Sequence, residues 1–334
     1  MDSLSTVALT RALVDIDSTT GREGEAGRWL AGELRRRGYR VTEQPVDASR
    51  FNIVATRTAP VVVFSTHFDC VPPFFPSREE GGRIYGRGSC DAKGILAAQV
   101  AAADALHAHG DDRVGLLFVV GEERGSDGAR LANTRPAGAR FLINGEPTDN
   151  RLGLATRGSY RVKLRAAGRA AHSSFPELGE SAIEKLIEAL GILRKLDLPD
   201  DHLLGRTHYT VGLIAGGVAP NVIPPSAEAE VLFRTVTPGR IIRDLLSRLD
   251  GLVTVEEMVD VPPVTMESVP GFDTAVFPYT TDIPYLSAWG RPLLFGPGSI
   301  HVAHTDHEFI EIAELHAAVE AYVGLAKGLL TRAA

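Results

Sequence analysis

One stretch of the sequence constrains the fold more than any other, because it ends a buried strand in an imidazole and a carboxylate. Apolar residues 61–64 lead into residues 65–73, where a closing Pro-Pro pair prevents further strand pairing. His67 and Asp69 are two residues apart, so on a strand they point to the same side. Burying both is costly unless a positive charge lies beside them. A metal ion is the leading candidate, and an ion pair at a strand end is the alternative.

Acidic residues and histidines return after later strand-like runs and glycine-rich turns. The residues that follow such segments are Asp91, Glu122, Glu123, Glu146, His304 and Asp306. An open α/β sheet builds its site from side chains at the ends of successive strands. Any one of these residues is equally typical of a helix cap or a surface charge. The whole series in one chain favours a shared site.

The order of these motifs resembles the M20 metallopeptidase family. The motifs are His-x-Asp at 67–69, Gly-Arg-Gly-x-x-Asp-x-Lys-Gly at 86–94, Glu-Glu at 122–123, Gly-Glu-Pro-Thr at 145–148, Gly-Pro-Gly-Ser at 296–299 and Ala-His at 303–304. The resemblance extends from about Val61 to His304 and beyond. The family includes acetylornithine deacetylase, succinyl-diaminopimelate desuccinylase, aminoacylase and glutamate-releasing carboxypeptidases.

The resemblance implies an enzyme with a two-zinc site. His67 and Glu146 are expected to hold one ion, Glu123 and His304 the other, and Asp91 is expected to bridge them. The resemblance also implies a cis peptide bond after the bridging aspartate. Nitrogen and carboxylate ligands suit Zn²⁺ with an open coordination position, and Co²⁺ or Mn²⁺ can substitute for it.

Two further carboxylates receive roles from the same resemblance. Glu122 is expected to be the general acid and base, because adjacent residues point differently and its neighbour Glu123 can ligate while Glu122 handles protons. Enclosure in a cleft favours a pKa near the operating pH, which such a base requires. Asp69 is expected to bond to the far nitrogen of His67 and so fix its tautomer.

Composition and charge limit the class of protein. A length of 334 residues predicts about two domains, and a net charge of −7 argues against a nucleic-acid surface. The basic run at 35–37 is typical of the solvated face of an amphipathic helix.

Residues 1–4 lack the features of a signal peptide, and no apolar run is long enough to span a membrane. Cys70 and Cys90 are expected to be free buried thiols, with a disulfide between them as the alternative. Together these points predict a cytoplasmic protein.

Helical and strand-like patterns alternate in the first part of the chain. Helices are expected at 4–17, 23–37, 92–108 and 125–133, and strands at 39–44, 52–56, 61–65, 114–120 and 141–143. This alternation is typical of an α/β sheet with helices on both faces. From about residue 262 the chain returns to loops and strands and ends in a helix at 308–330.

The pattern between these two parts is different. Strands are expected at 159–167, 207–215, 227–235 and 253–259, and helices at 181–195 and 238–249. Their β-α-β-β-α-β order is the ferredoxin-like motif. We therefore predict a mixed-sheet α/β catalytic domain of the zinc-exopeptidase type in two parts, 1–157 and 263–334. A ferredoxin-like α+β lid and dimerisation domain, 158–262, is inserted between them.

The resemblance assigns functions to residues of the lid and of the last glycine-rich motif. His172 occupies the place of a family histidine that reaches the active site of the partner subunit, which implies a homodimer through the lid. Asn221 and Arg234 match positions that hold the substrate carboxylate, although a turn asparagine and a solvated arginine are the alternatives. Gly298 and Ser299 are also assigned to substrate binding.

The substrate is predicted to be a small N-acyl amino acid. Glu146 resembles deacylases and carboxypeptidases, and residues 296–300 look most like acetylornithine deacetylase, so an N-acetyl group is the first choice. Succinyl-diaminopimelate desuccinylase and a carboxypeptidase or dipeptidase are alternatives. The spacing from His304 to Glu308 resembles enzymes acting on carrier-linked lysine or ornithine, and a non-catalytic binding relative is the remote alternative. Asp282 is expected to be a solvated loop carboxylate, with contact to a substrate ammonium as the alternative.

Overall fold

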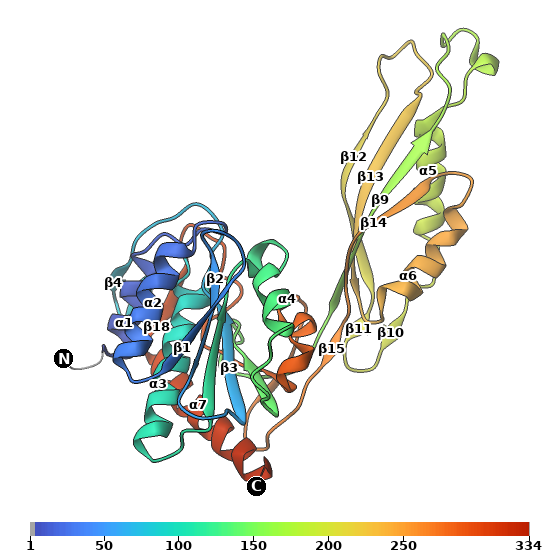
Figure 1. Cartoon of the computed structure of the whole chain (residues 1–334). Helices are drawn as coiled ribbons and strands as arrows, with labels where there is room; N and C mark the ends of the chain where they lie inside the picture. The colour runs from blue at the N-terminus through green and yellow to red at the C-terminus, as the bar shows by residue number, and fades with distance from the viewer. Residues whose placement is uncertain (1–3, 334) are drawn as a thin grey trace. The chain divides into compact units, whose positions relative to one another are not determined.

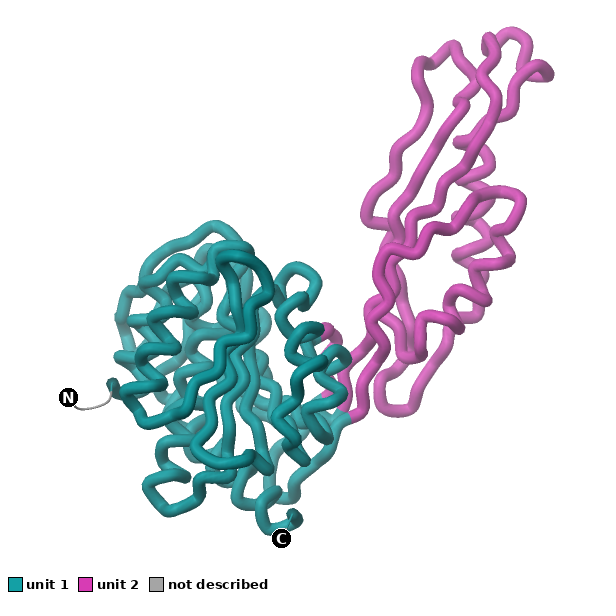
Figure 2. The backbone as a smooth tube through the Cα atoms, in the orientation of Figure 1, with its two compact units in different colours: residues 1–154, 266–275, 281–334 teal, residues 155–265, 276–280 magenta. Residues whose placement is uncertain are grey.

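The computed structural model describes residues 4–333 and divides into two compact units (Figure 1), which Figure 2 shows in different colours. Unit 1 comprises the chain up to residue 154, residues 266–275 and the chain from 281 onward, and unit 2 comprises residues 155–265 and 276–280. Residues 1–3, on which the signal-peptide prediction partly rests, lie outside the described residues. Between residues 4 and 333, no helix is both long and apolar enough to cross a membrane.

A large mixed sheet is the centre of unit 1. Its strands lie in the order β1 (Arg40–Pro45), β2 (Phe51–Thr56), β6 (Val114–Val119), β3 (Val62–His67), β7 (Phe141–Asn144), β17 (Arg291–Leu294) and β8 (Leu152–Thr156). Strands β6, β3, β7 and β17 pair in parallel, whereas the β1–β2, β2–β6 and β17–β8 pairs are antiparallel. The carboxyl ends of the four parallel strands therefore share one edge.

Helices cover both faces of this sheet (Figure 1). On one face lie α1 (Thr6–Val14), α2 (Gly24–Arg36), α3 (Gly94–Ala108) and α7 (Ile312–Ala333). On the other face, α4 (Asp127–Asn133) shares a smaller core with Trp289. Val63 packs into this smaller core and its neighbour Phe64 into the larger one, as alternation along a strand requires. The sheet is therefore buried on both faces, which is typical of parallel strands.

Unit 2 contains an antiparallel sheet with its own core. The strands lie in the order β12 (His208–Gly216), β13 (Ser226–Thr235), β9 (Gly158–Ala167) and β14 (Thr254–Val261). Helices α5 (Ala182–Leu193) and α6 (Gly239–Leu246) share one apolar core with this sheet. The order confirms the ferredoxin-like prediction, because the first strand along the chain lies between the third and the fourth. A short hairpin of β10 (Asp200–Asp201) and β11 (Gly205–Arg206) completes the unit.

A small sheet corrects the prediction for the C-terminal helix. It is formed by β4 (Arg78–Glu80), β5 (Arg83–Tyr85) and β18 (Phe309–Glu311). The helix predicted from residue 308 begins only at Ile312, because β18 pairs with β5 and the Phe309 ring packs against that of Tyr85. Tertiary pairing outweighs helical periodicity here. The segment that follows the lid contains the short strands β15 (Val264–Thr265) and β16 (Thr274–Phe277).

Candidate metal centre and active site

The residues predicted as metal ligands lie just beyond the carboxyl ends of the parallel strands. His67 is the last residue of β3, Glu123 follows β6 in a short helical turn, and Glu146 comes shortly after β7. Asp91 precedes α3, and His304 lies in the segment between β17 and β18. The carboxyl ends of neighbouring parallel strands bring side chains from distant parts of a sequence close together, as they do for these predicted ligands.

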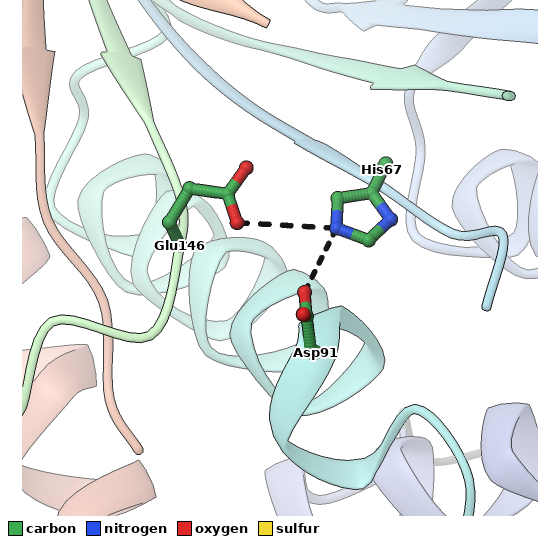
Figure 3. Close-up of side chains that lie close together, drawn as sticks. All are labelled: His67, Asp91 and Glu146. Carbon is green, nitrogen blue, oxygen red and sulfur yellow. Dashed lines mark hydrogen bonds and ion pairs between the residues drawn. The ribbon is translucent and has the colours of Figure 1, made fainter. Parts of the chain in front are cut away.

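His67, Asp91 and Glu146 form the first of two triads (Figure 3). Nε2 of His67 lies 2.9 Å from Oδ1 of Asp91 and 4.0 Å from Oε2 of Glu146. All three side chains are buried, and Oε1 of Glu146 has no hydrogen-bond partner within residues 4–333. The ligand atoms lie within 4.8 Å of one another, which is close enough for one ion to contact all three.

Asp91, Glu123 and His304 form the second triad. Nε2 of His304 lies 2.8 Å from Oε1 of Glu123 and 3.3 Å from Oδ2 of Asp91. Asp91 thus offers one oxygen to each triad, and the peptide bond to Ala92 is cis, as the resemblance implied. His304 has a backbone φ of +64°, a left-handed conformation that is uncommon for non-glycine residues.

Asp69 joins the ends of β3 and β6. Its carboxylate accepts hydrogen bonds from the backbone N–H of Glu122 at 3.1 Å, the N–H of Glu123 at 3.3 Å and the Thr20 hydroxyl at 2.9 Å. Its Oδ1 lies 3.5 Å from Nδ1 of His67, and the same nitrogen lies 3.0 Å from the backbone carbonyl of Asp69. With Nδ1 engaged in this way, Nε2 of His67 faces the triad, which is the orientation that a ligating histidine needs.

Buried negative charge dominates the electrostatics of the site. Burial raises the pKa of Glu122 and that of Glu146 well above the usual range, and their mutual proximity adds to the rise for Glu122. Burial opposes ionisation of Asp91 as well, but hydrogen bonds from His304 and His67 lower its pKa overall. Hydrogen bonds to Asp91 and Glu123 raise the pKa of His304 to about 10. Carboxylates held this close repel one another unless a cation lies between them.

The donor set fits a dinuclear metal centre. It consists of imidazole nitrogens and carboxylate oxygens without a thiolate, which suits Zn²⁺, Co²⁺ or Mn²⁺. The orphaned Oε1 of Glu146 is a buried acceptor that a cation would satisfy. The shared Asp91 places the two triads next to each other.

Asp282 is a buried acid of this site, so the expectation of a solvated loop carboxylate is wrong. It is 1% exposed and precedes the short helical turn Ile283–Tyr285. Its pKa is raised to about 7, and burial is the largest cause of this rise. The charge of Asp69 adds to the rise, whereas the Ser126 side chain and the charge of His67 partly offset it. The sequence carried no signal for this burial, because the surroundings of Asp282 come from segments far away in the chain.

Gly298 and Ser299 lie against Cys90, the neighbour of Asp91. Gly298 has a φ of +85°, and an added Cβ would lie 2.5 Å from Sγ of Cys90, so only glycine fits. The Cys90 thiol lies 3.5 Å from the Ser299 carbonyl, which accepts its hydrogen bond. Cys70 and Cys90 are both free and buried, as the sequence predicts. Substrate binding by Gly298 and Ser299 stays a prediction.

The other three predicted site residues belong to unit 2. His172 is exposed and forms a β-bridge with Val222, and the carbonyl of Asn221 accepts a hydrogen bond from Ser173 at 3.0 Å. The structure therefore brings His172 and Asn221 together. Arg234 lies on β13, where burial lowers its pKa, and no acidic side chain within residues 4–333 pairs with it. The contribution of these residues to catalysis stays a prediction.

An α/β sheet with two carboxylate–histidine triads at the carboxyl edge of its parallel strands defines the class of dinuclear metallohydrolases. The chain belongs to the M20 family, because residues 63–328 match the model of Peptidase family M20/M25/M40. A peptidase M20 domain-containing protein of Schizosaccharomyces pombe is 38% identical, and the match covers 95% of this chain and 82% of that protein. A probable carboxypeptidase of Aspergillus terreus is 39% identical, with coverage of 93% and 83%.

Solved structures share the fold at lower sequence identity. The aminopeptidase PepT of Bacillus cereus has a TM-score of 0.81 at 19% identity and covers 99% of both chains. An M20 family metallo-carboxypeptidase of Sulfolobus solfataricus has a TM-score of 0.75 at 18% identity, with coverage of 98% and 99%. YXEP of Bacillus subtilis, a dinuclear metal-binding peptidase of the M20 family, has a TM-score of 0.73 at 16% identity, with coverage of 98% and 97%.

The buried Asp282 should make the metal-free protein less stable as the pH rises. Its folded-state pKa of about 7 lies above the usual aspartate value of roughly 3.9, so its contribution to stability is greatest below that value and declines as the pH rises toward 7. Asp282→Asn removes this decline. We therefore expect a smaller drop in melting temperature between about pH 5 and about pH 8 in the chelator-treated variant than in wild type.

Circular dichroism during heating measures this difference. Asp273→Asn, which alters an exposed carboxylate nearby in the sequence, is the matched control and should keep the wild-type pH dependence. An Asp282→Asn variant whose melting temperature drops as much as that of wild type would contradict the assignment.

Proposed function

We propose that the protein is a two-zinc exopeptidase that cleaves the last peptide bond of small peptides with a free C-terminal carboxylate. The observation that carries this proposal is the pair of triads joined by Asp91, with Glu122 next to the ligand candidate Glu123. The names of the relatives support the substrate class, since the 39% identical protein of Aspergillus terreus is a probable carboxypeptidase.

A deacylase acting on N-acyl amino acids is the second candidate. The Gly-Pro-Gly-Ser-Ile segment at 296–300 favours it, because that segment most resembles acetylornithine deacetylase. N-succinyl and carrier-linked substrates belong to the same candidate. Both candidates share the reaction, which is hydrolysis of an amide next to a carboxylate-bearing amino acid.

Five residues would hold the metal ions. His67 and Glu146 would bind one Zn²⁺, Glu123 and His304 the other, and Asp91 both, while Co²⁺ or Mn²⁺ can substitute. Bound ions would lower the pKa of a shared water and polarise the amide carbonyl of the substrate.

Glu122 is the group that moves protons in this proposal. It belongs to neither triad, and the bond from its backbone N–H to Asp69 holds it at the end of β6. Its pKa is raised by burial, so it takes up a proton more readily than an ordinary glutamate, as a general base must. As the water oxygen bonds to the amide carbon, Glu122 accepts the proton of the water. Glu122 then gives this proton to the leaving nitrogen as the carbon–nitrogen bond breaks.

The lid is proposed to hold the carboxylate of the substrate. Arg234 supports this role, because its partly buried guanidinium has no acidic partner within residues 4–333. A guanidinium can bind a carboxylate through two parallel hydrogen bonds, which gives both affinity and orientation. Asn221 would add an amide donor, and its neighbour His172 would serve the site of a second subunit.

A homodimer through the lid is part of the proposal. Strand β12 is an edge strand of the unit 2 sheet, and Leu213 and Ile214 on it are 64% and 63% exposed. Ile187 on α5 and Val218 just after β12 are exposed apolar residues as well. Exposed edge strands with apolar side chains are ready to pair with another chain, and two copies would pair about a two-fold axis.

A substrate comparison tests the proposed function. With Zn²⁺, we expect the protein to release the C-terminal amino acid from N-blocked dipeptides and to fail on the matched C-terminal amides. A chelator should abolish release, and added Zn²⁺ should restore it. Faster release from N-acetylornithine or N-succinyl-diaminopimelate would favour the deacylase candidate. A metal-loaded protein that hydrolyses none of these substrates would refute both.

Glu122→Gln should separate proton transfer from metal binding. Because Glu122 is proposed to carry protons and not metal, the variant should keep its bound zinc and lose roughly 10²–10⁴-fold in turnover. Metal analysis and the dipeptide assay measure the two quantities on the same sample. Glu25→Gln, an exposed glutamate on α2, should behave as wild type in both. Loss of zinc together with activity would make Glu122 a ligand.

Mixed dimers test the role of His172. If its side chain donates a hydrogen bond to the oxyanion in the other subunit, His172→Ala should lower turnover roughly 10²–10³-fold. Heterodimers of His172→Ala and Glu122→Ala subunits contain one intact composite site and should recover part of the activity. Verified heterodimers without recovery would exclude sharing between subunits.

A further inference from the structure

Glu308 is a buried carboxylate beneath the residue shared by the two triads. Its Oε1 accepts hydrogen bonds from the backbone N–H groups of Cys90 at 3.1 Å and Asp91 at 3.0 Å. The residue is 0% exposed. Carboxylates are almost never fully buried unless they are paired, so this position needs a partner.

Arg87 is that partner. Its Nη1 donates to Oε2 of Glu308 at 2.7 Å, and its side chain is 2% exposed. Arg87 is itself held, because its Nε donates to the carbonyl of Pro73 at 3.2 Å and its guanidinium lies 5.0 Å from the centre of the Phe75 ring. A buried ion pair is costly to desolvate and adds little net stability, but it can define one arrangement of the chain.

Both carboxylate oxygens of Glu308 are engaged by protein donors, and Glu308 belongs to neither triad. One oxygen receives two backbone N–H groups and the other receives the guanidinium. Glu308 therefore acts on the site through the backbone of Asp91 and not as a metal ligand. It also follows His304 by four residues, so it ties the segment of the second triad to the residue that both triads share.

We propose that Glu308, oriented by Arg87, is a positioning residue that holds the backbone of Asp91 so that its two carboxylate oxygens face the two triads. This inference rests on the proposed metal centre. It predicts that breaking the Arg87–Glu308 pair weakens metal binding even though neither residue touches the metal. Partners of this kind, which hold a ligand in place, typically contribute 10–100-fold to metal affinity.

Glu308→Gln is the direct test, because glutamine keeps the shape but brings an NH₂ group. That group must face either the guanidinium or the two backbone N–H groups, which sets donor against donor. We expect zinc affinity, measured by competition with a chromophoric chelator, to fall about 10–100-fold. The absorption spectrum of the Co²⁺-loaded variant should differ from that of wild type, while circular dichroism shows a folded metal-free protein.

Glu33→Gln is the matched control for loss of a buried glutamate–arginine pair. Glu33 is 4% exposed on α2 and pairs with Arg36 at 2.6 Å and Arg37 at 2.8 Å. A purely structural role for Glu308 would give both variants the same result, namely lower stability with unchanged zinc affinity. Our proposal requires lower zinc affinity in Glu308→Gln alone.

The outcomes separate this inference from the proposed function. A wild-type protein that binds no metal would refute the metal centre itself. A wild type that binds two ions, with Glu308→Gln binding them equally tightly, would refute only the positioning role. If Glu308→Gln does not fold, Arg87→Met decides the question. Reduced zinc affinity in that folded variant supports the role, and wild-type affinity overturns it.

Discussion

Negative charge is buried where the parallel strands of the large sheet end, and the neighbouring elements are arranged around it. Six carboxylates meet there with two histidines, and they belong to Asp69, Asp91, Glu122, Glu123, Glu146 and Asp282. Hydrogen bonds reduce the repulsion between these carboxylates at two of them. Backbone and hydroxyl donors satisfy Asp69, and the histidines bond to Asp91. The remaining charge calls for cations, and the geometry of the triads suits two of them.

The sheet supplies the rigidity that such a site needs. β3 is buried at every residue and pairs in parallel with strands on both sides, so His67 leaves the sheet from a fixed point. Asp69 then fastens the end of β3 to the turn after β6, which places Glu122 and Glu123. Sites whose residues lie on strands, or directly beyond their ends, hold their geometry better than sites on free loops.

Unit 2 carries the predicted substrate-binding residues of the lid. Its sheet and two helices enclose a separate core, and its site candidates lie on the sheet and on the neighbouring loops. The proposed function assigns the substrate carboxylate to residues of this unit and the metal ions to residues of unit 1.

The class of fold and the metal-ligand candidates could be predicted from the sequence. Strand and helix periods are local signals that predict the fold, and the resemblance of the ordered motifs to the M20 family supplied the ligand candidates, of which Asp91 and His304 follow glycine-rich turns. Three further features could not be predicted from the sequence. The strand β18, the burial of Asp282 and the Arg87–Glu308 pair all depend on partners from distant segments, and the last of these joins residues 221 positions apart. No local pattern encodes such contacts, because burial and pairing exist only once the chain has folded.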